Sequence, residues 1–259
     1  MNKNKVLIMM YQEGASGLDG GNRKGGNYAL RCMVHDANVV ADAFSEMGIT
    51  PAICDVYGVG RDIFAEEMTP NATKISIADV PALCRSGELI GAVMTGQHAR
   101  NGAPHAFMSF TVNEVAWFEY RLNGVVMGDI GIGAAFLGAF GVPVLAVCGD
   151  KAACLEAKEL LGDISCAEVK SAQIRNWAKC LPQKDADELL ANVCKQAFER
   201  FAEVSPLIVQ APYHVSVTFG RADFADDCIM YNDGRAKRIS PLICEKTTEK
   251  IEKYMDVKF

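Results

Sequence analysis

Three side chains that can bind a metal ion stand where predicted strands end or a predicted helix begins. Glu13 follows the apolar run Lys5–Tyr11, His98 follows the apolar run Ile90–Thr95, and Asp129 opens an apolar helix. In open α/β sheets, ligands bind beyond the carboxyl ends of the strands. Two carboxylates and one imidazole suit zinc or a similar divalent ion. The sequence therefore makes Glu13, His98 and Asp129 candidate metal ligands.

Each of these residues also has a simpler interpretation. Glu13 could be a solvated loop acid, His98 a hydrogen-bonded histidine of the core, and Asp129 an acid favoured by the dipole at a helix start. His105 lies in the loop after His98 and is the nearest spare imidazole. It is a candidate general acid/base or a fourth ligand, or simply a loop histidine after Pro104. The residues alone leave these alternatives open.

The elements that would position these residues alternate between strands and helices along most of the chain. A loop rich in glycine follows the first strand as far as Gly26, and the dipeptide Asn123-Gly124 predicts a β-hairpin over Val115–Met127. We predict an α/β fold with a mostly parallel central sheet flanked by helices, as one domain over residues 1–259, with a smaller α+β region over about 165–259. The predicted strands are Lys5–Tyr11, Thr50–Tyr57, Thr73–Ala78, Ile90–Thr95, Val142–Val147, Ser165–Ile174 and Ser205–Phe219, and the predicted helices are Asn27–Met47, Val80–Gly87, Gly128–Phe140, Asp150–Leu161, Gln183–Ala202, Arg221–Met230 and Lys246–Met255.

Composition excludes several classes of function. The 259 residues carry a net charge of −6 without a long basic run, which argues against nucleic acid as a partner. No segment reaches the roughly 20 apolar residues that span a bilayer, and the N-terminal apolar run Val6–Met10 is too short for a signal peptide. The ten cysteines include no C-x-x-C pair, which favours a reducing compartment, and we expect a cytoplasmic protein that does not bind membranes. Gly131-Ile132-Gly133 is not a dinucleotide-binding motif, because Phe136 takes the place of its third glycine and the run follows a hairpin.

Several short motifs together resemble one family over nearly the whole chain. They are EGASG at Glu13–Gly17, the turn at Asp55, TGQHAR at Thr95–Arg100, Met108-Ser109, LNGVVMGDIGIGA at Leu122–Ala134, VPVLAVCGD at Val142–Asp150 and VKSA at Val169–Ala172. On these motifs the chain resembles the zinc-dependent D-aminopeptidases of the DppA type. The resemblance implies an aminopeptidase that acts on short peptides or small amides. It also implies a homo-oligomer, because members of the family form pentameric rings stacked into decamers.

The resemblance also implies roles for the candidate ligands. Members of the family hold two zinc ions between strand-end carboxylates and histidines. Glu13 matches the glutamate after the first strand, His98 matches the histidine of the H-A-R motif, and Asp129 stands as a shorter acid where the family has the glutamate of its G-E-[LI]-G motif.

Three aromatic residues depart from the family pattern. Tyr11 stands where the bridging aspartate belongs, Tyr57 replaces the histidine after the second strand, and Phe110 replaces the histidine after Met-Ser. A neutral tyrosine does not offset the repulsion between two dications, and a phenol ionises only near pH ~10. We therefore expect at most one zinc ion, or none. The two resulting hypotheses are a metal-dependent aminopeptidase-like hydrolase, and a non-catalytic relative that binds a small ligand in an aromatic pocket.

Overall fold

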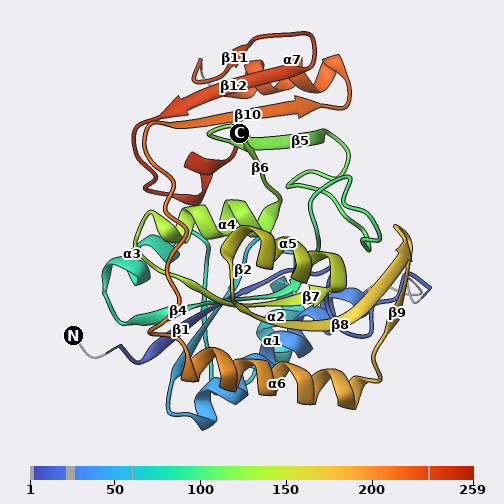
Figure 1. Cartoon of the computed structure of the whole chain (residues 1–259), viewed down its shortest axis with the longest axis vertical. Helices are drawn as coiled ribbons and strands as arrows, with labels where there is room; N and C mark the ends of the chain where they lie inside the picture. The colour runs from blue at the N-terminus through green and yellow to red at the C-terminus, as the bar shows by residue number, and fades with distance from the viewer. Residues whose placement is uncertain (1–2, 22–26, 60, 233) are drawn as a thin grey trace.

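The large sheet is mostly parallel, as predicted. The computed structural model describes residues 3–21, 27–59, 61–232 and 234–259, so the glycine-rich stretch 22–26 lies outside the described residues. Within the described part, seven strands run in the order β3-β2-β1-β4-β7-β8-β9, and only the edge strand β9 is antiparallel to its neighbour (Figure 1). These strands are β1 (Lys5–Met10), β2 (Thr50–Asp55), β3 (Thr73–Ile75), β4 (Leu89–Gln97), β7 (Val144–Asp150), β8 (Ser165–Ile174) and β9 (Trp177–Cys180).

Side chains of the central strand β1 alternate between two cores. Val6, Ile8 and Met10 pack with the helices of one face, while Leu7 and Met9 pack toward the other face. Both faces of a mostly parallel sheet are covered, so its strands are apolar throughout. The first face carries α1 (Tyr28–Glu46), α2 (Arg61–Glu67) and α6 (Gln183–Glu199), and the second carries α3 (Val80–Arg85), α4 (Asp129–Gly138) and α5 (Lys151–Leu161).

The register of the parallel strands brings three strand ends to one level. Met10 at the end of β1 pairs with Asp55 of β2 on one side and with Thr95 of β4 on the other. The residues that follow these strands therefore emerge together at one edge of the sheet, where the candidate ligands were predicted.

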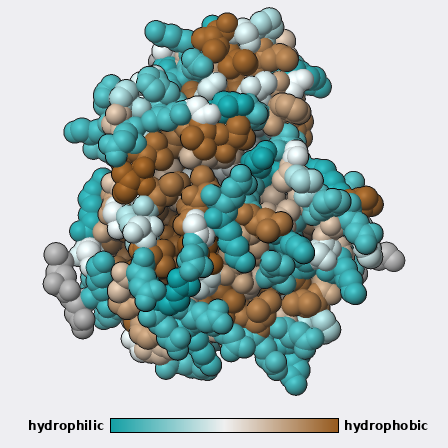
Figure 2. Space-filling view, in the orientation of Figure 1, coloured by the Kyte–Doolittle hydropathy of each residue, from teal (hydrophilic) through white to brown (hydrophobic). Residues whose placement is uncertain are grey.

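A second, antiparallel sheet lies beyond α4, with α7 (Ala222–Tyr231) across it (Figure 1). Its inward-facing residues, among them Tyr120, Leu122, Val215 and Val217, share the core of α4. Apolar side chains gather at the waist between this sheet and the larger body (Figure 2). Its strands run in the order β11 (Lys237–Arg238), β12 (Ile243–Thr248), β10 (Tyr213–Phe219), β5 (Trp117–Leu122) and β6 (Val125–Val126).

The antiparallel sheet draws on two parts of the chain. Its strands β5 and β6 come from the middle of the sequence, whereas β8, β9 and α6 belong to the large sheet and its cover. The smaller region therefore does not coincide with residues 165–259. The predicted hairpin is confirmed, with positive φ at Asn123 (49°) and Gly124 (81°) as a type I′ turn requires.

Two predictions for the last third of the chain were wrong in extent or type. Of the predicted strand Ser205–Phe219, only Tyr213–Phe219 pairs in a sheet. The predicted helix Lys246–Met255 is instead the end of β12 followed by the 3₁₀ turn η1 (Tyr254–Val257). Lys246 pairs with Val215 of β10, so the ladder of the antiparallel sheet overrides the local helical pattern. Among the helices of the described residues, none combines the length and the apolar character needed to cross a membrane.

Candidate active site

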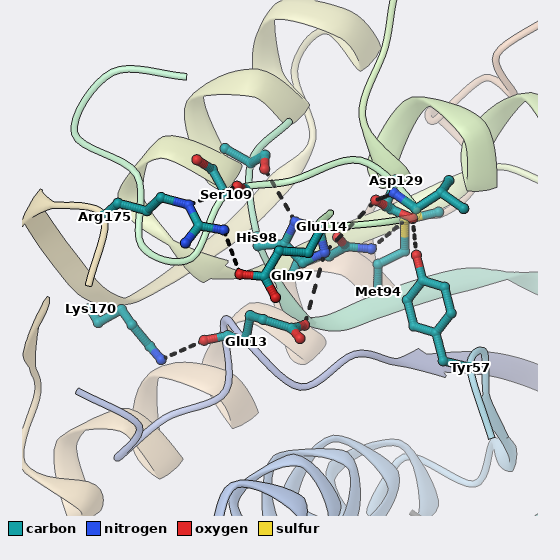
Figure 3. A network of polar contacts seen from close by, with 12 residues as sticks. Glu13, Tyr57, Met94, Gln97, His98, Ser109, Glu114, Asp129, Lys170 and Arg175 are labelled. Carbon is teal, nitrogen blue, oxygen red and sulfur yellow. Dashed lines mark hydrogen bonds and ion pairs between the residues drawn. The ribbon is translucent and has the colours of Figure 1, made fainter. Parts of the chain in front are cut away.

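The structure brings Glu13, His98 and Asp129 together around one imidazole nitrogen (Figure 3). His98 Nε2 lies 3.9 Å from Glu13 Oε2 and 3.8 Å from Asp129 Oδ2. Glu13 stands in the loop after β1, His98 directly follows β4, and Asp129 is the first residue of α4. Strand ends and a helix start thus converge as the sequence suggested.

A close backbone approach sets the position of Glu13. The Gly14 N–H donates to the Gly96 carbonyl at 2.8 Å, and a Cβ built on Gly14 would lie 1.8 Å from the Gln97 carbonyl oxygen. Only glycine permits this contact. The loop after β1 therefore lies directly on the end of β4, which brings Glu13 to His98.

The imidazole of His98 is oriented by its other nitrogen and by an aromatic ring. Nδ1 lies 3.2 Å from the Ala99 carbonyl, which can only accept a hydrogen bond, so Nδ1 donates and Nε2 faces the two carboxylates. Phe110 stacks on the imidazole at 4.0 Å between ring centroids and 21° between planes. The side chain is fully buried, and Nε2 has no hydrogen-bond partner among the described residues.

Negative charge surrounds this histidine. Burial alone would lower the pKa of His98, but the Asp129 and Glu13 carboxylates raise it above its ordinary value. Burial raises the pKa of Glu13, against the attraction of His98. Glu156 of α5 adds a further acid, which accepts the Arg100 backbone N–H at 2.7 Å and whose pKa burial raises to about 7. A cation is therefore favoured at Nε2 of His98.

Both oxygens of Asp129 already accept hydrogen bonds. Oδ1 accepts from the Tyr57 hydroxyl, and Oδ2 accepts from the Val112 backbone N–H at 2.9 Å. Tyr11 meets the edge of Tyr57, with ring centroids 5.8 Å apart. Burial and the nearby Asp129 raise the pKa of both tyrosines, so both phenols are neutral. The tyrosines therefore supply no anionic ligand for a second metal ion.

A cavity of about 360 Å³ opens in front of the cluster. Its lining includes three aromatic rings and three acids, from Tyr11, Tyr57, Phe110, Glu13, Asp55 and Glu114. Glu13 reaches both the cavity and His98, whereas His98 and Asp129 are fully buried and are not part of the cavity wall. The aromatic residues thus stand between the cavity and the deeper part of the cluster.

His105 is not part of this cluster. It is exposed, adopts a positive φ of 53°, and does not line the cavity. In the described part of the chain, no hydrogen bond or ion pair joins it to Glu13, His98 or Asp129. Its role as a general acid/base stays a prediction without support from its position.

Lys170 is a residue to which sequence reasoning assigned no role. Its ammonium donates to the carbonyls of Glu13 (3.0 Å) and Leu18 (2.6 Å) and lies 4.7 Å from the ring centroid of Phe107. Burial lowers its pKa to about 8. The sequence did hold a signal for this residue, because Lys170 lies within the partly alternating apolar strand predicted over Ser165–Ile174. A lysine buried in such a strand needs partners.

The donor set suits one divalent ion but is not a ready-made centre. The His98 Nε2 and Glu13 Oε2 atoms are buried without hydrogen-bond partners in the described part of the chain, and imidazole and carboxylate are zinc ligands. Ligands at about 2.1 Å from a tetrahedral zinc lie about 3.4 Å apart, and here the donors are 3.8 and 3.9 Å apart. Among the described residues no group of three or more His, Cys, Asp or Glu side chains has the geometry of a metal site. To bind zinc together with His98, the two carboxylates would have to move closer to Nε2 by a few tenths of an ångström.

Comparison with known proteins agrees with this architecture. The sequence profile of the D-aminopeptidase family matches residues 5–257. A D-aminopeptidase of Bacillus subtilis (strain 168) is 30% identical over 237 residues, which cover 86% of this chain and 85% of that protein. The solved structure of the Zn-dependent D-aminopeptidase DppA from Bacillus subtilis, described as a self-compartmentalizing protease, superposes with a TM-score of 0.85 at 22% identity, covering 98% of this chain and 94% of that one.

Proposed function

The chain belongs to the D-aminopeptidase family, and on that premise we propose that it is a hydrolase of short peptides or small amides with a free amino group. The observation that carries the proposal is the convergence of Glu13, His98 and Asp129 behind the cavity, with His98 Nε2 facing both carboxylates and making no hydrogen bond among the described residues. The name of the relative suggests substrates with an amino-terminal D-residue.

The cavity has two kinds of wall, which suit the two parts of such a substrate. The acids Glu13, Asp55 and Glu114 attract an ammonium group, and the rings of Tyr11 and Phe110 offer apolar area to a side chain. Glu13 is the acid that also faces His98. We assign Glu13 to the reacting end of the substrate for this reason.

We propose that Glu13, His98 and Asp129 hold a single zinc ion. When bound, a divalent ion supplies Lewis-acid activation of a carbonyl group and of water. The protein residues do the remaining work. The Ala99 carbonyl fixes the imidazole through Nδ1, the Val112 N–H orients the Asp129 carboxylate, and Phe110 shields the imidazole from bulk water.

Metal content and turnover test this proposal on the same samples. Protein purified without chelators should contain about one zinc per chain by elemental mass spectrometry, since three protein ligands make the usual catalytic site. Glu13→Ala and His98→Ala should lose the metal and the hydrolysis of peptides with amino-terminal D-residues. His35→Ala, which removes a surface histidine paired with Asp187, is the matched control. Absence of stoichiometric metal after zinc is added would refute the metallohydrolase.

The same variants test His105. If it is the general acid/base, His105→Ala should keep the metal and lose turnover, with a changed pH profile. Full activity in His105→Ala would remove it from the reaction, in agreement with its exposed position.

A second candidate function is ligand binding without hydrolysis. Two observations favour it. Phe110 stacks on His98, and the Tyr57 hydroxyl donates a hydrogen bond to Asp129. In this case the aromatic cavity retains a small ligand that is not cleaved. A ligand that binds His98→Ala as tightly as the wild type would support this function, and turnover that depends on His98 would exclude it.

We further propose a cytoplasmic homo-oligomer that binds neither nucleic acid nor membranes. The net charge of −6 and ten free cysteines support the compartment and the absence of nucleic acid. The solved relative is described as self-compartmentalizing, which supports assembly into an oligomer, and the family resemblance implies a pentamer or decamer. Light scattering coupled to gel filtration tests this, and a monomer at micromolar concentration would contradict it.

A further inference from the structure

The C-terminal tail places a buried lysine against the candidate site. Lys258 is 6% exposed, and its ammonium lies 4.7 Å from the ring centroid of Tyr57 and 4.2 Å from that of Tyr254. Both distances fall within the range of cation–π attraction, which is stronger when the cation is desolvated. The ammonium therefore sits in a cage of two aromatic rings.

The tail is held in place by the antiparallel sheet. The Tyr120 hydroxyl of β5 donates to the Val257 carbonyl at 2.7 Å, and the Lys246 ammonium of β12 donates to the Met255 carbonyl at 3.0 Å. The Lys258 backbone N–H closes the turn on Met255 at 3.3 Å. These contacts fix the backbone from Met255 to Lys258, and the two ring contacts place the ammonium.

Tyr57 connects this cage to the site. Its hydroxyl donates to Asp129, its ring faces Lys258, and Tyr11 meets it edge-on. The field of Asp129 favours the charged form of Lys258, although burial lowers the pKa of this lysine to about 8. At neutral pH one phenol therefore contacts a positive charge over its ring and a buried carboxylate at its hydroxyl.

We propose that Lys258 is a positioning residue that holds Tyr57 on Asp129 and thereby weakens the binding of a divalent ion by Glu13, His98 and Asp129. The tethered ammonium offsets part of the negative field that would attract the ion, and the phenol that it holds occupies one oxygen of Asp129. The effect on metal rests on the proposed function, whereas the effect on Tyr57 does not.

Zinc affinity measured by competition with a chromogenic chelator tests the electrostatic part. Lys258→Met keeps an unbranched side chain but removes the charge, and it should bind zinc about tenfold more tightly than the wild type. Lys258→Arg should behave as the wild type, because guanidinium also stacks on aromatic rings. Lys250→Met, at an exposed lysine of the same C-terminal segment, is the matched control. The higher zinc affinity expected of Lys258→Met should be absent from the double variant Lys258→Met/His98→Ala.

Zinc binding that is equal in the wild type and Lys258→Met, yet lost in His98→Ala, overturns the proposal and leaves the metal site intact. A second measurement does not depend on metal and applies if no variant binds zinc. In protein labelled with ¹³C in its tyrosine rings, the signal of Tyr57, assigned with Tyr57→Phe, should move in Lys258→Met and return in Lys258→Arg. If no variant binds zinc but this signal moves, the positioning role stands and the metallohydrolase falls. An unmoved Tyr57 signal overturns the positioning role.

Discussion

Replacing Lys170 with methionine tests how the loop that carries Glu13 is held. The wild-type ammonium donates to two carbonyls, the partly buried one of Glu13 and the buried one of Leu18. Methionine keeps an apolar contact with Phe107 but leaves both carbonyls without this donor, at about 1–3 kcal/mol each. Removing a buried charge returns part of that cost. We expect Lys170→Met to lower the free energy of unfolding by about 2 kcal/mol at neutral pH.

The pH dependence of this difference follows from the lysine pKa. The pKa falls from 10.5 to about 8 on folding, because burial disfavours the charged form. Between these two values the unfolded wild type binds one more proton than the folded protein, so wild-type stability rises with pH by about 1.4 kcal/mol per unit. The variant lacks this group. The gap between the two proteins should therefore widen by about 2 kcal/mol on raising the pH from about 8 to about 9.5.

Urea denaturation at a fixed protomer concentration measures this gap at each pH. Lys184→Met, which removes an exposed lysine of α6, is the control and should leave the free energy of unfolding and its pH dependence nearly unchanged. The reasoning would be refuted if the difference in free energy of unfolding between the wild type and Lys170→Met stayed constant or narrowed above about pH 8. In that case folding would not lower the pKa of Lys170.

Two further predictions concern the scaffold around the site. Asp150 caps α5 through the Ala153 N–H and also accepts the Phe107 N–H, both at 2.8 Å, so Asp150→Ala should cost about 2–3 kcal/mol in urea denaturation. Asp150→Asn should cost less because one acceptor remains, and equal losses would contradict this account. A Cβ on Gly91 would lie 2.5 Å from Leu145 Cγ, so Gly91→Ala should lower stability by about 1–3 kcal/mol. The double variant Gly91→Ala/Leu145→Ala should lose less stability than the sum of the two single losses. Equal values would show that the added methyl group does not contact Leu145.

Local sequence was sufficient for much of the large sheet. The apolar runs of β1, β4 and β7 are typical of strands buried on both faces, and such runs are recognisable without their partners. Asn123-Gly124 predicted its hairpin because positive φ at successive residues is a property of those residue types. Glu13, His98 and Asp129 could be selected because strand ends in parallel sheets share one edge.

Other features depend on contacts between distant parts of the chain. The segment Lys246–Met255 has a pattern compatible with a helix, and only pairing with β10 makes its first residues part of a strand. His105 and His98 are near neighbours in sequence, yet one is exposed and the other fully buried, because the loop between them turns outward.

The sequence by itself determined the α/β class, the strand-end placement of the three candidate ligands and the presence of tyrosines at positions 11 and 57. Only the tertiary structure decided what surrounds those ligands. Lys170 meets Glu13 from 157 positions away along the chain, and Lys258 reaches Tyr57 from the opposite end. The charge and hydrogen bonding of a buried group are set by whatever side chains the fold packs against it, and no local pattern contains that information.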